Sequence, residues 1–135
     1  MMTSNATPPR ALVVGHGDFA AGLVSAVGAI AGRAGDFVAL SNQGLTPDGI
    51  ERAIRETVEG LSLVVVFTDL PGGSCTIAAR KVQRLRPSLI VAAGSSAATL
   101  LDFAMNDAVP PRDAAARAVA RGRDAMLLVE GAGAG

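Results

Sequence analysis

The chain has 135 residues, of which half are apolar, and its twelve acidic residues balance twelve basic ones. This length suits one compact domain with an aliphatic core, and the neutral balance argues against the basic surface that nucleic acids and anionic membranes attract. The only cysteine, Cys75, excludes an internal disulfide and a zinc site built on several cysteines, and it fits a reducing compartment.

The first nine residues, MMTSNATPP, lack the basic start and the apolar stretch of a signal peptide. No apolar run approaches the roughly 20 residues that a membrane span requires. We therefore expect a cytoplasmic protein. We also expect a disordered tail over residues 1–9, a single folded domain over residues 10–130, and a flexible tail over residues 131–135.

The first half of the chain alternates between short apolar runs and helical spacing. ALVVG at residues 11–15 predicts a strand that is buried on both faces, and residues 37–40 predict a second strand. A helix is predicted over residues 18–32, and another begins with Thr46 as N-cap and Pro47 as first residue. The predicted apolar stripes are Phe19, Leu23, Val27 and Ile30 in the first helix, and Ile50, Ile54, Val58 and Leu61 in the second.

The second half continues the alternation. LVVVF at residues 63–67 predicts the clearest strand of the chain, and Pro87 ends the helix that follows it. The remaining predicted elements are that helix over residues 74–86, a strand over 88–93, helices over 97–105 and 112–121, and a last apolar strand over 125–130.

This order of elements predicts an α/β fold. We expect a flavodoxin-like, mainly parallel sheet of four strands in the order 2-1-3-4, flanked by helices on both faces. Such sheets bind ligands at the carboxyl ends of their strands, where the winding direction reverses, and here the reversal lies between strands one and three. His16 leaves strand one and Asp69 leaves strand three at that edge, so the two residues should be neighbours in space.

His16 is the only histidine of the chain, and it lies between Gly15 and Gly17. An imidazole near neutral pH serves as a base, a ligand or a nucleophile. Asp69 can accept a hydrogen bond from one ring nitrogen, which would fix the tautomer and make the other nitrogen more nucleophilic. The pair therefore predicts a reactive histidine with an orienting carboxylate.

Backbone N–H groups should surround that histidine. The helix beginning near Asp18 and the helix beginning after the Gly-Gly turn both direct free N–H groups at the same edge, which favours an anion. The expected phosphate environment consists of Gly17, Gly72, Gly73 and Ser74. Together with His16 and Asp69, these groups suit reversible phosphorylation of the histidine, and we expect neither a metal ion nor an organic cofactor.

Other interpretations of these residues remain open. A lone histidine at a strand end is commonly a hydrogen-bonded surface residue, and a Gly-Gly pair commonly marks a turn. Cys75 stands at a helix start that would favour a thiolate, but a phosphatase-like anion loop needs a longer spacing than the one from Cys75 to Arg80. Dinucleotide-loop, P-loop, HExxH and GxSxG patterns are absent from the sequence. The basic cluster of Arg80, Lys81, Arg84 and Arg86 is typical of a solvated helix face, and a docking role stays open for it.

Three segments carry a resemblance to a known family: GHGDFAAGL with its following helix (residues 15–32), VVVFTDLPGGS (64–74) and IVAAGSSAATLL (90–101). The chain resembles the enzyme IIA components of the mannose-type family of the bacterial phosphoenolpyruvate-dependent sugar phosphotransferase system (PTS), over roughly residues 10–130. The resemblance implies that His16 is the phosphorylated histidine, that Asp69 orients it, and that the Gly-Gly-Ser turn belongs to the site.

The resemblance also implies partners. Such proteins accept a phosphoryl group from the phosphocarrier protein HPr and pass it to a IIB component, which phosphorylates sugar as it crosses the membrane through IIC and IID. The family is typically a homodimer in which a C-terminal strand pairs with the sheet of the other subunit, and residues 125–130 are the candidate for that strand. Unpaired, this strand would expose an apolar edge.

Two departures from the family pattern concern the rim of the site. The loop after strand four reads Gly-Ser-Ser-Ala-Ala at residues 94–98 where many members have Gly-Val-Asn, and Cys75 stands where proline is common. His16 and Asp69 are unchanged, so phosphorylation is expected and specificity for partner and sugar is left open. Two alternatives remain: a regulatory phosphoacceptor that is not coupled to transport, and a non-catalytic module that binds a small anion.

Overall fold

The computed structural model of the chain describes residues 8–133. The disordered tail expected at the N-terminus therefore lies outside the described residues over residues 1–7, as does the flexible tail expected at the C-terminus over residues 134–135. Within the described part, every helix is far shorter than a bilayer span, because the longest have 14 residues.

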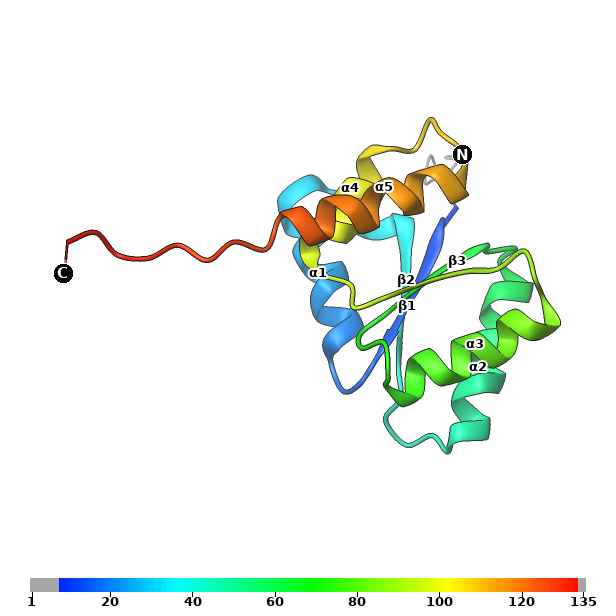
Figure 1. The fold of residues 1–135 in the computed structure, drawn as a ribbon. Helices are drawn as coiled ribbons and strands as arrows, with labels where there is room; N and C mark the ends of the chain where they lie inside the picture. The colour runs from blue at the N-terminus through cyan, green and yellow to red at the C-terminus, as the bar shows by residue number, and fades with distance from the viewer. Residues whose placement is uncertain (1–7, 134–135) are drawn as a thin grey trace.

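Four parallel strands form one sheet in the order β2-β1-β3-β4, as the sequence predicted (Figure 1). The strands are β1 (Ala11–Gly15), β2 (Phe37–Ser41), β3 (Val65–Thr68) and β4 (Ile90–Ala93). Every residue of the two central strands, β1 and β3, is buried, which explains why their sequences are continuously apolar and do not alternate. The register sets the ends of β1, β2 and β3 close together, with Gly15 opposite Ser41 and Val14 opposite Thr68.

Helices cover both faces of the sheet. They are α1 (Phe19–Ala31), α2 (Pro47–Gly60), α3 (Ser74–Leu85), α4 (Ala97–Met105) and α5 (Pro111–Asp124), with a short 3-10 turn, η1 (Ala34–Asp36), before β2. Helices α1, α4 and α5 pack on one face, and α2 and α3 pack on the other (Figure 1). The expected start of α2 is confirmed, because the Thr46 hydroxyl accepts a hydrogen bond from the Gly49 N–H at 3.0 Å.

Two positions of the predicted apolar stripes are wrong. Ile30 and Leu61 are exposed, although Val27 and Val58, one turn earlier in each helix, are fully buried. Both exposed residues stand at the C-terminal end of their helices. The apolar spacing of each helix extends to its last turn, but the sheet does not extend that far. The side chains of Ile30 and Leu61 are therefore left exposed.

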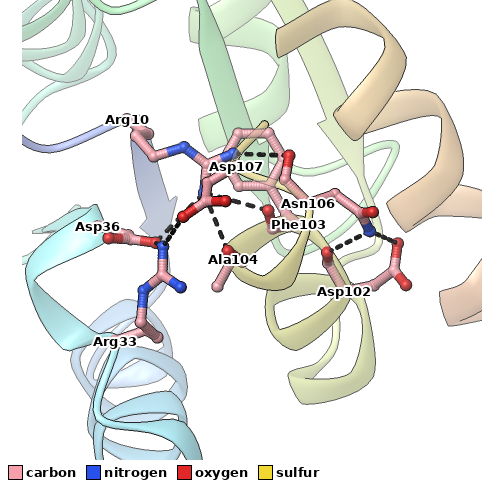
Figure 2. A network of polar contacts seen from close by, with 8 residues as sticks. All are labelled: Arg10, Arg33, Asp36, Asp102, Phe103, Ala104, Asn106 and Asp107. Carbon is pink, nitrogen blue, oxygen red and sulfur yellow. Dashed lines mark hydrogen bonds and ion pairs between the residues drawn. The ribbon is translucent and has the colours of Figure 1, made fainter. Parts of the chain in front are cut away.

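An ionic network ties together the amino end of the sheet (Figure 2). Arg10, just before β1, places Nη1 3.2 Å from Asp36 Oδ2 and donates to the Phe103 carbonyl at 3.1 Å. Arg33 Nη2 lies 2.8 Å from Asp36 Oδ2 and 3.0 Å from Asp107 Oδ2. The Arg10 guanidinium also lies 4.3 Å from the centroid of the Phe103 ring. The network therefore joins the start of β1, the turn before β2 and the end of α4.

The expected last strand does not form within this chain. Helix α5 continues three residues past its predicted end, to Asp124, and residues 125–130 have no regular structure. The segment leads away from the domain (Figure 1), and Met126, Leu127, Leu128 and Val129 are 76–90% exposed. The physical reason is direction: the segment leaves the end of α5 pointing away from the sheet, so it reaches neither sheet edge of its own chain.

Candidate active site at the carboxyl edge of the sheet

The structure brings His16 and Asp69 into direct contact, as the strand order predicted. His16 follows the last residue of β1, and Asp69 follows the last residue of β3. The carboxylate oxygen Oδ2 of Asp69 lies 2.6 Å from Nδ1 of the His16 ring and accepts the His16 backbone N–H at 2.9 Å. One carboxylate oxygen thus fixes both the ring and the backbone of the histidine.

The Asp69 carboxylate is held in its ionised form. Burial acts to raise the pKa of Asp69, but hydrogen bonds from the His16 ring and from the backbone N–H groups of His16 and Leu70 outweigh it. The pKa consequently lies below its ordinary value of 3.8. At neutral pH the side chain is a pure acceptor, so in the neutral ring the proton resides on Nδ1 and the lone pair on Nε2.

The Nε2 side of the ring faces the Gly-Gly-Ser turn. Ser74 Oγ lies 3.1 Å from His16 Nε2, and a Cβ added to Gly73 would lie 3.5 Å from the ring carbon Cε1. A side chain at Gly73 would therefore reach van der Waals contact with the imidazole. The His16 side chain is 46% exposed, whereas that of Asp69 is only 8% exposed. The carboxylate is covered, whereas about half of the ring that it contacts is exposed to solvent.

Two helix N-termini converge on this ring without side-chain caps. No side chain caps α1 or α3, and these are the helices that begin beside His16 and at Ser74. By contrast, Thr46 caps α2, and Ser96 forms a capping box with Thr99 at α4. Uncapped first turns keep backbone N–H groups and the positive ends of two helix dipoles available to an anion.

The N–H group of Gly17, one of the residues expected around the phosphate, is hydrogen-bonded within the loops of the site. Gly17 adopts a left-handed backbone conformation, with φ of 55°, and its N–H donates to Asn42 Oδ1 at 3.1 Å. The Asn42 N–H in turn donates to the Gly15 carbonyl at 3.1 Å. Sequence reasoning missed Asn42, although a signal existed: it is a polar residue at the carboxyl end of β2, the strand next to β1.

Two threonines shape the turn after β3, and sequence reasoning missed both. Thr68 Oγ1 and Thr76 Oγ1 are 2.6 Å apart in a buried hydrogen bond, and the Thr76 hydroxyl also contacts the Leu70 carbonyl. The Gly73 N–H donates to that same carbonyl at 3.1 Å. The turn that carries Ser74 is therefore fixed from beneath by buried hydroxyl groups.

A family model described as PTS system fructose IIA component, EIIA-man, matches residues 10–120. The chain belongs to this family of IIA components. The match confirms the resemblance that the three sequence segments indicated. A search of curated protein sequences finds no match.

Solved structures of IIA proteins share this fold. A phosphotransferase system component EIIA from Streptococcus agalactiae is 18% identical, with a TM-score of 0.78 over 87% of this chain and 95% of that one. The mannose/sorbose-specific IIA subunit from Enterococcus faecalis is 19% identical, with a TM-score of 0.77 over 92% and 96% of the two chains. The IIA protein associated with the fucose utilization operon of Streptococcus pneumoniae is 21% identical, with a TM-score of 0.77 over 91% and 94%.

Cys75, one of the departures of this IIA chain from its family pattern, is fully buried at the start of α3. Burial, followed by the nearby charge of Asp69, raises the pKa of the Cys75 thiol. A buried neutral thiol is a small apolar side chain rather than a nucleophile. The structure thus gives Cys75 a packing position beneath the site.

His16, Asp69 and Cys75 also place one potential metal-ligating atom each within 4.8 Å of one another. The chemistry of this donor set does not suit a metal. The His16 Nδ1 and the Asp69 carboxylate already share a hydrogen bond, and a cysteine binds metal as a thiolate, which its raised pKa disfavours. The three side chains are better explained as a His-Asp pair above a buried thiol.

The second departure, residues 94–98, forms ordered structure beside the site. The Ser95 N–H donates to the Thr68 carbonyl at 3.0 Å, and Ser96 caps α4. Gly94, with φ of 78°, lies against Pro71 of the turn between β3 and α3. A cavity of about 610 Å³ lies between residues 93–99 and the C-terminal end of α5. His16 does not line this cavity. The loop therefore contacts the end of β3 and the turn after it, but its cavity is separate from His16.

Proposed function

We propose that this IIA protein is a phosphohistidine carrier of a sugar phosphotransferase system. It accepts a phosphoryl group from HPr on His16 and passes it to a IIB component for sugar uptake and phosphorylation. The observation that carries the proposal is the contact of Nδ1 with the Asp69 carboxylate, because this contact leaves Nε2 as the nucleophile on the exposed side of the ring.

The chemistry is an in-line exchange between two imidazoles. The lone pair of His16 Nε2 attacks the phosphorus of the phosphorylated donor, a new N–P bond forms, and the donor N–P bond breaks with its electron pair returning to the donor ring. The Nδ1 proton stays between His16 and Asp69, whose negative charge offsets the positive charge that develops on the phosphorylated ring. Transfer to IIB repeats the exchange with His16 as the leaving group.

The groups around Nε2 receive the phosphoryl oxygens. The Ser74 hydroxyl, 3.1 Å from Nε2 in the free site, is placed to donate to an oxygen that replaces this contact. The uncapped first turns of α1 and α3 supply N–H groups and positive dipole ends. Gly72 and Gly73 belong to the turn that faces the ring, and Gly17 positions the histidine loop through Asn42. Catalysis then consists of positioning and anion stabilisation.

The remaining partners follow from the same proposal. The carrier acts in the cytoplasm as a homodimer, and IIB links it indirectly to the membrane components IIC and IID. The exposed run at residues 126–129 supports the dimer, because an isolated apolar strand gains burial and backbone hydrogen bonds when it pairs with the sheet of a second subunit. Analytical ultracentrifugation of the chain with and without residues 125–135 tests this pairing: the truncated chain should sediment as a monomer.

Intact-protein mass spectrometry at alkaline pH tests the carrier function. The chain is incubated with phosphoenolpyruvate, enzyme I and HPr, and the expected result is a gain of one acid-labile phosphoryl group. His16→Ala should show no gain while unfolding at the same urea concentration as wild type, because the His16 side chain is largely outside the core. Full labelling of His16→Ala, or none of the wild type with active HPr, would overturn the proposal.

A further inference from the structure

The hydroxyl of Thr76 is directed out of its own helix. A threonine inside a helix commonly donates its hydroxyl to the carbonyl four residues earlier, as Thr57 does to Ala53 at 2.8 Å. Thr76, in the first turn of α3, instead donates to the carbonyl of Leu70, in the turn that precedes the helix. That carbonyl also accepts the Gly73 N–H at 3.1 Å. The Thr76 hydroxyl therefore ties α3 to the turn before it.

A second hydroxyl, that of Thr68 at the end of β3, orients the first. Thr68 Oγ1 lies 2.6 Å from Thr76 Oγ1, and both threonines are buried. A hydroxyl has only one proton, and Thr76 gives its proton to the Leu70 carbonyl, so Thr68 is the donor of the pair. The backbone of Thr68 is fixed as well, because its carbonyl accepts the Ser95 N–H at 3.0 Å. The two hydroxyls thus form a directed chain of hydrogen bonds from the sheet to the turn.

The backbone of Leu70 connects this chain to the His-Asp pair. Its carbonyl accepts from Thr76, and its N–H donates to Asp69 Oδ1 at 2.9 Å. The other carboxylate oxygen, Oδ2, lies 2.6 Å from His16 Nδ1. Polar contacts therefore lead from the buried hydroxyls, through one backbone residue, to the group that holds the histidine ring.

The same Leu70 carbonyl also bears on the opposite side of the ring. It accepts the Gly73 N–H, and Ser74 follows directly, with its Oγ 3.1 Å from His16 Nε2. The uncapped first turn of α3 begins at the same serine. The groups that face the two ring nitrogens are thus both linked to the single carbonyl that the Thr76 hydroxyl holds.

We propose that Thr76 is a positioning residue for phosphoryl transfer and that Thr68 orients its hydroxyl. This inference rests on the proposed carrier function. Neither hydroxyl touches the reacting atoms, and Thr76 acts through the Leu70 backbone on the carboxylate at Nδ1 and on the serine at Nε2. A displacement of about 1 Å can cost a hundredfold in rate, so a hydrogen bond that fixes both groups contributes to the reaction. Because the two hydroxyls are buried, water does not readily replace either of them.

Four variants separate positioning from stability. Thr76→Val removes the contact with Leu70 and leaves the buried Thr68 hydroxyl without its acceptor, whereas Thr76→Ser keeps a hydroxyl. Thr68→Val removes only the donor to Thr76 and retains the contact with Leu70. The double variant Thr68→Val/Thr76→Val has no unpaired hydroxyl, yet its turn is as free as in Thr76→Val. In urea unfolding, the double variant should therefore be more stable than Thr76→Val.

Labelling of His16 is measured by mass spectrometry with two donors, phosphorylated HPr and phosphoramidate, a small donor that needs no docked protein. We expect Thr76→Val and the double variant to lose about tenfold in rate with both donors, and Thr68→Val and Thr76→Ser to stay within about threefold of wild type. A rate that recovers together with stability in the double variant would overturn the proposal. A loss confined to HPr would also overturn it, because the hydroxyls would then affect docking.

The His16 ring supplies a readout that a purely structural role would not move. In nitrogen-15 spectra of the folded protein at neutral pH, wild type and Thr68→Val should carry the neutral ring's proton on Nδ1. Thr76→Val should show a mixture of tautomers, because the carboxylate that selects Nδ1–H is less fixed. An unchanged ring spectrum in Thr76→Val would contradict the positioning role.

The outcome for wild type distinguishes this inference from the carrier function. Labelling of wild type, with equal rates in all four variants, would overturn the positioning role of Thr76 and leave the carrier function standing. No labelling of wild type by either donor, with HPr active on a known acceptor, would overturn the carrier function and the positioning role together.

Discussion

The two edges of the sheet use charge in opposite ways. At the amino edge, Arg10 and Arg33 share the carboxylate of Asp36, which is almost completely buried, and each cation is paired (Figure 2). At the carboxyl edge, the carboxylate of Asp69 holds the His16 ring, which is 46% exposed and whose far nitrogen contacts the Ser74 hydroxyl at 3.1 Å. The charged groups of the amino edge are thus paired with one another, whereas the ring at the carboxyl edge remains half exposed to solvent.

We therefore expect substitutions at the two edges of the sheet to affect different properties: the free energy of unfolding at the amino edge and the reaction at the carboxyl edge. Substitutions at the amino edge should change the free energy of unfolding and leave the reaction alone, because their contacts join β1, η1 and α4. Substitution of His16 or Asn42 at the carboxyl edge should change the reaction and leave folding nearly unchanged, because these two side chains lie in loops outside the hydrophobic core.

The largest effect on the reaction short of removing His16 is expected for Asp69→Asn. An amide in place of the carboxylate can present its NH₂ group to Nδ1, which favours the wrong tautomer, and it cannot stabilise the phosphorylated ring. We expect the rate of labelling by phosphorylated HPr to fall about a hundredfold or more. Rapid-quench mass spectrometry measures this rate, and a fall of less than threefold would show that Asp69 does not orient the ring.

The matched change at the amino edge is Asp36→Ala. It leaves Arg10 and Arg33 without their shared, buried carboxylate, and we expect the free energy of unfolding to fall by about 2 kcal/mol. Urea unfolding followed by circular dichroism measures the loss. At a temperature where the variant is folded, its labelling rate should equal that of wild type. A labelling rate reduced as strongly as in Asp69→Asn would contradict the proposed difference between the two edges.

A smaller effect on the reaction is expected for Asn42→Ala. The variant loses the acceptor for the Gly17 N–H, so the loop carrying His16 is less fixed. We expect about a fivefold lower labelling rate, the equivalent of roughly one hydrogen bond. Asn42→Asp retains an acceptor for the Gly17 N–H, so its labelling rate should be close to that of wild type. Equal rates for Asn42→Ala and wild type would remove Asn42 from the site.

The smallest expected effect is the loss of the Asp69 contribution to stability at low pH. The lowered pKa of Asp69 means that its contribution to stability is fully present above the ordinary value of 3.8 and is lost as pH falls through the still lower folded-state pKa. The backbone N–H groups of His16 and Leu70 both donate to this carboxylate. Their amide resonances in NMR should therefore shift with a midpoint below pH 3.8, and a midpoint above that value would contradict the hydrogen-bonding pattern.

The sequence predicted the sheet order and the meeting of His16 with Asp69 for a physical reason. Strands buried on both faces and helices with regular apolar spacing leave few arrangements, and a parallel sheet brings its carboxyl ends to one edge. Asn42, Thr68 and Thr76 were not predicted, because side-chain bonds to loop backbone depend on loop geometry that no periodicity encodes. The segment over residues 125–130 was predicted as a strand from its apolar residues and from the resemblance, which pairs it with another subunit, and in the single chain it has no neighbouring strand.

The identity of the phosphorylated nitrogen tests the central claim most directly. In the proposed transfer, Asp69 occupies Nδ1 and the phosphoryl group forms its bond with Nε2. Protein labelled with nitrogen-15 at histidine is phosphorylated by HPr, and long-range proton–nitrogen NMR spectra of the ring identify the substituted nitrogen. A phosphoryl group on Nε2 of His16, with the Nδ1 proton retained, is the predicted result. A phosphoryl group on Nδ1 would contradict the assignment of Asp69 as the orienting residue.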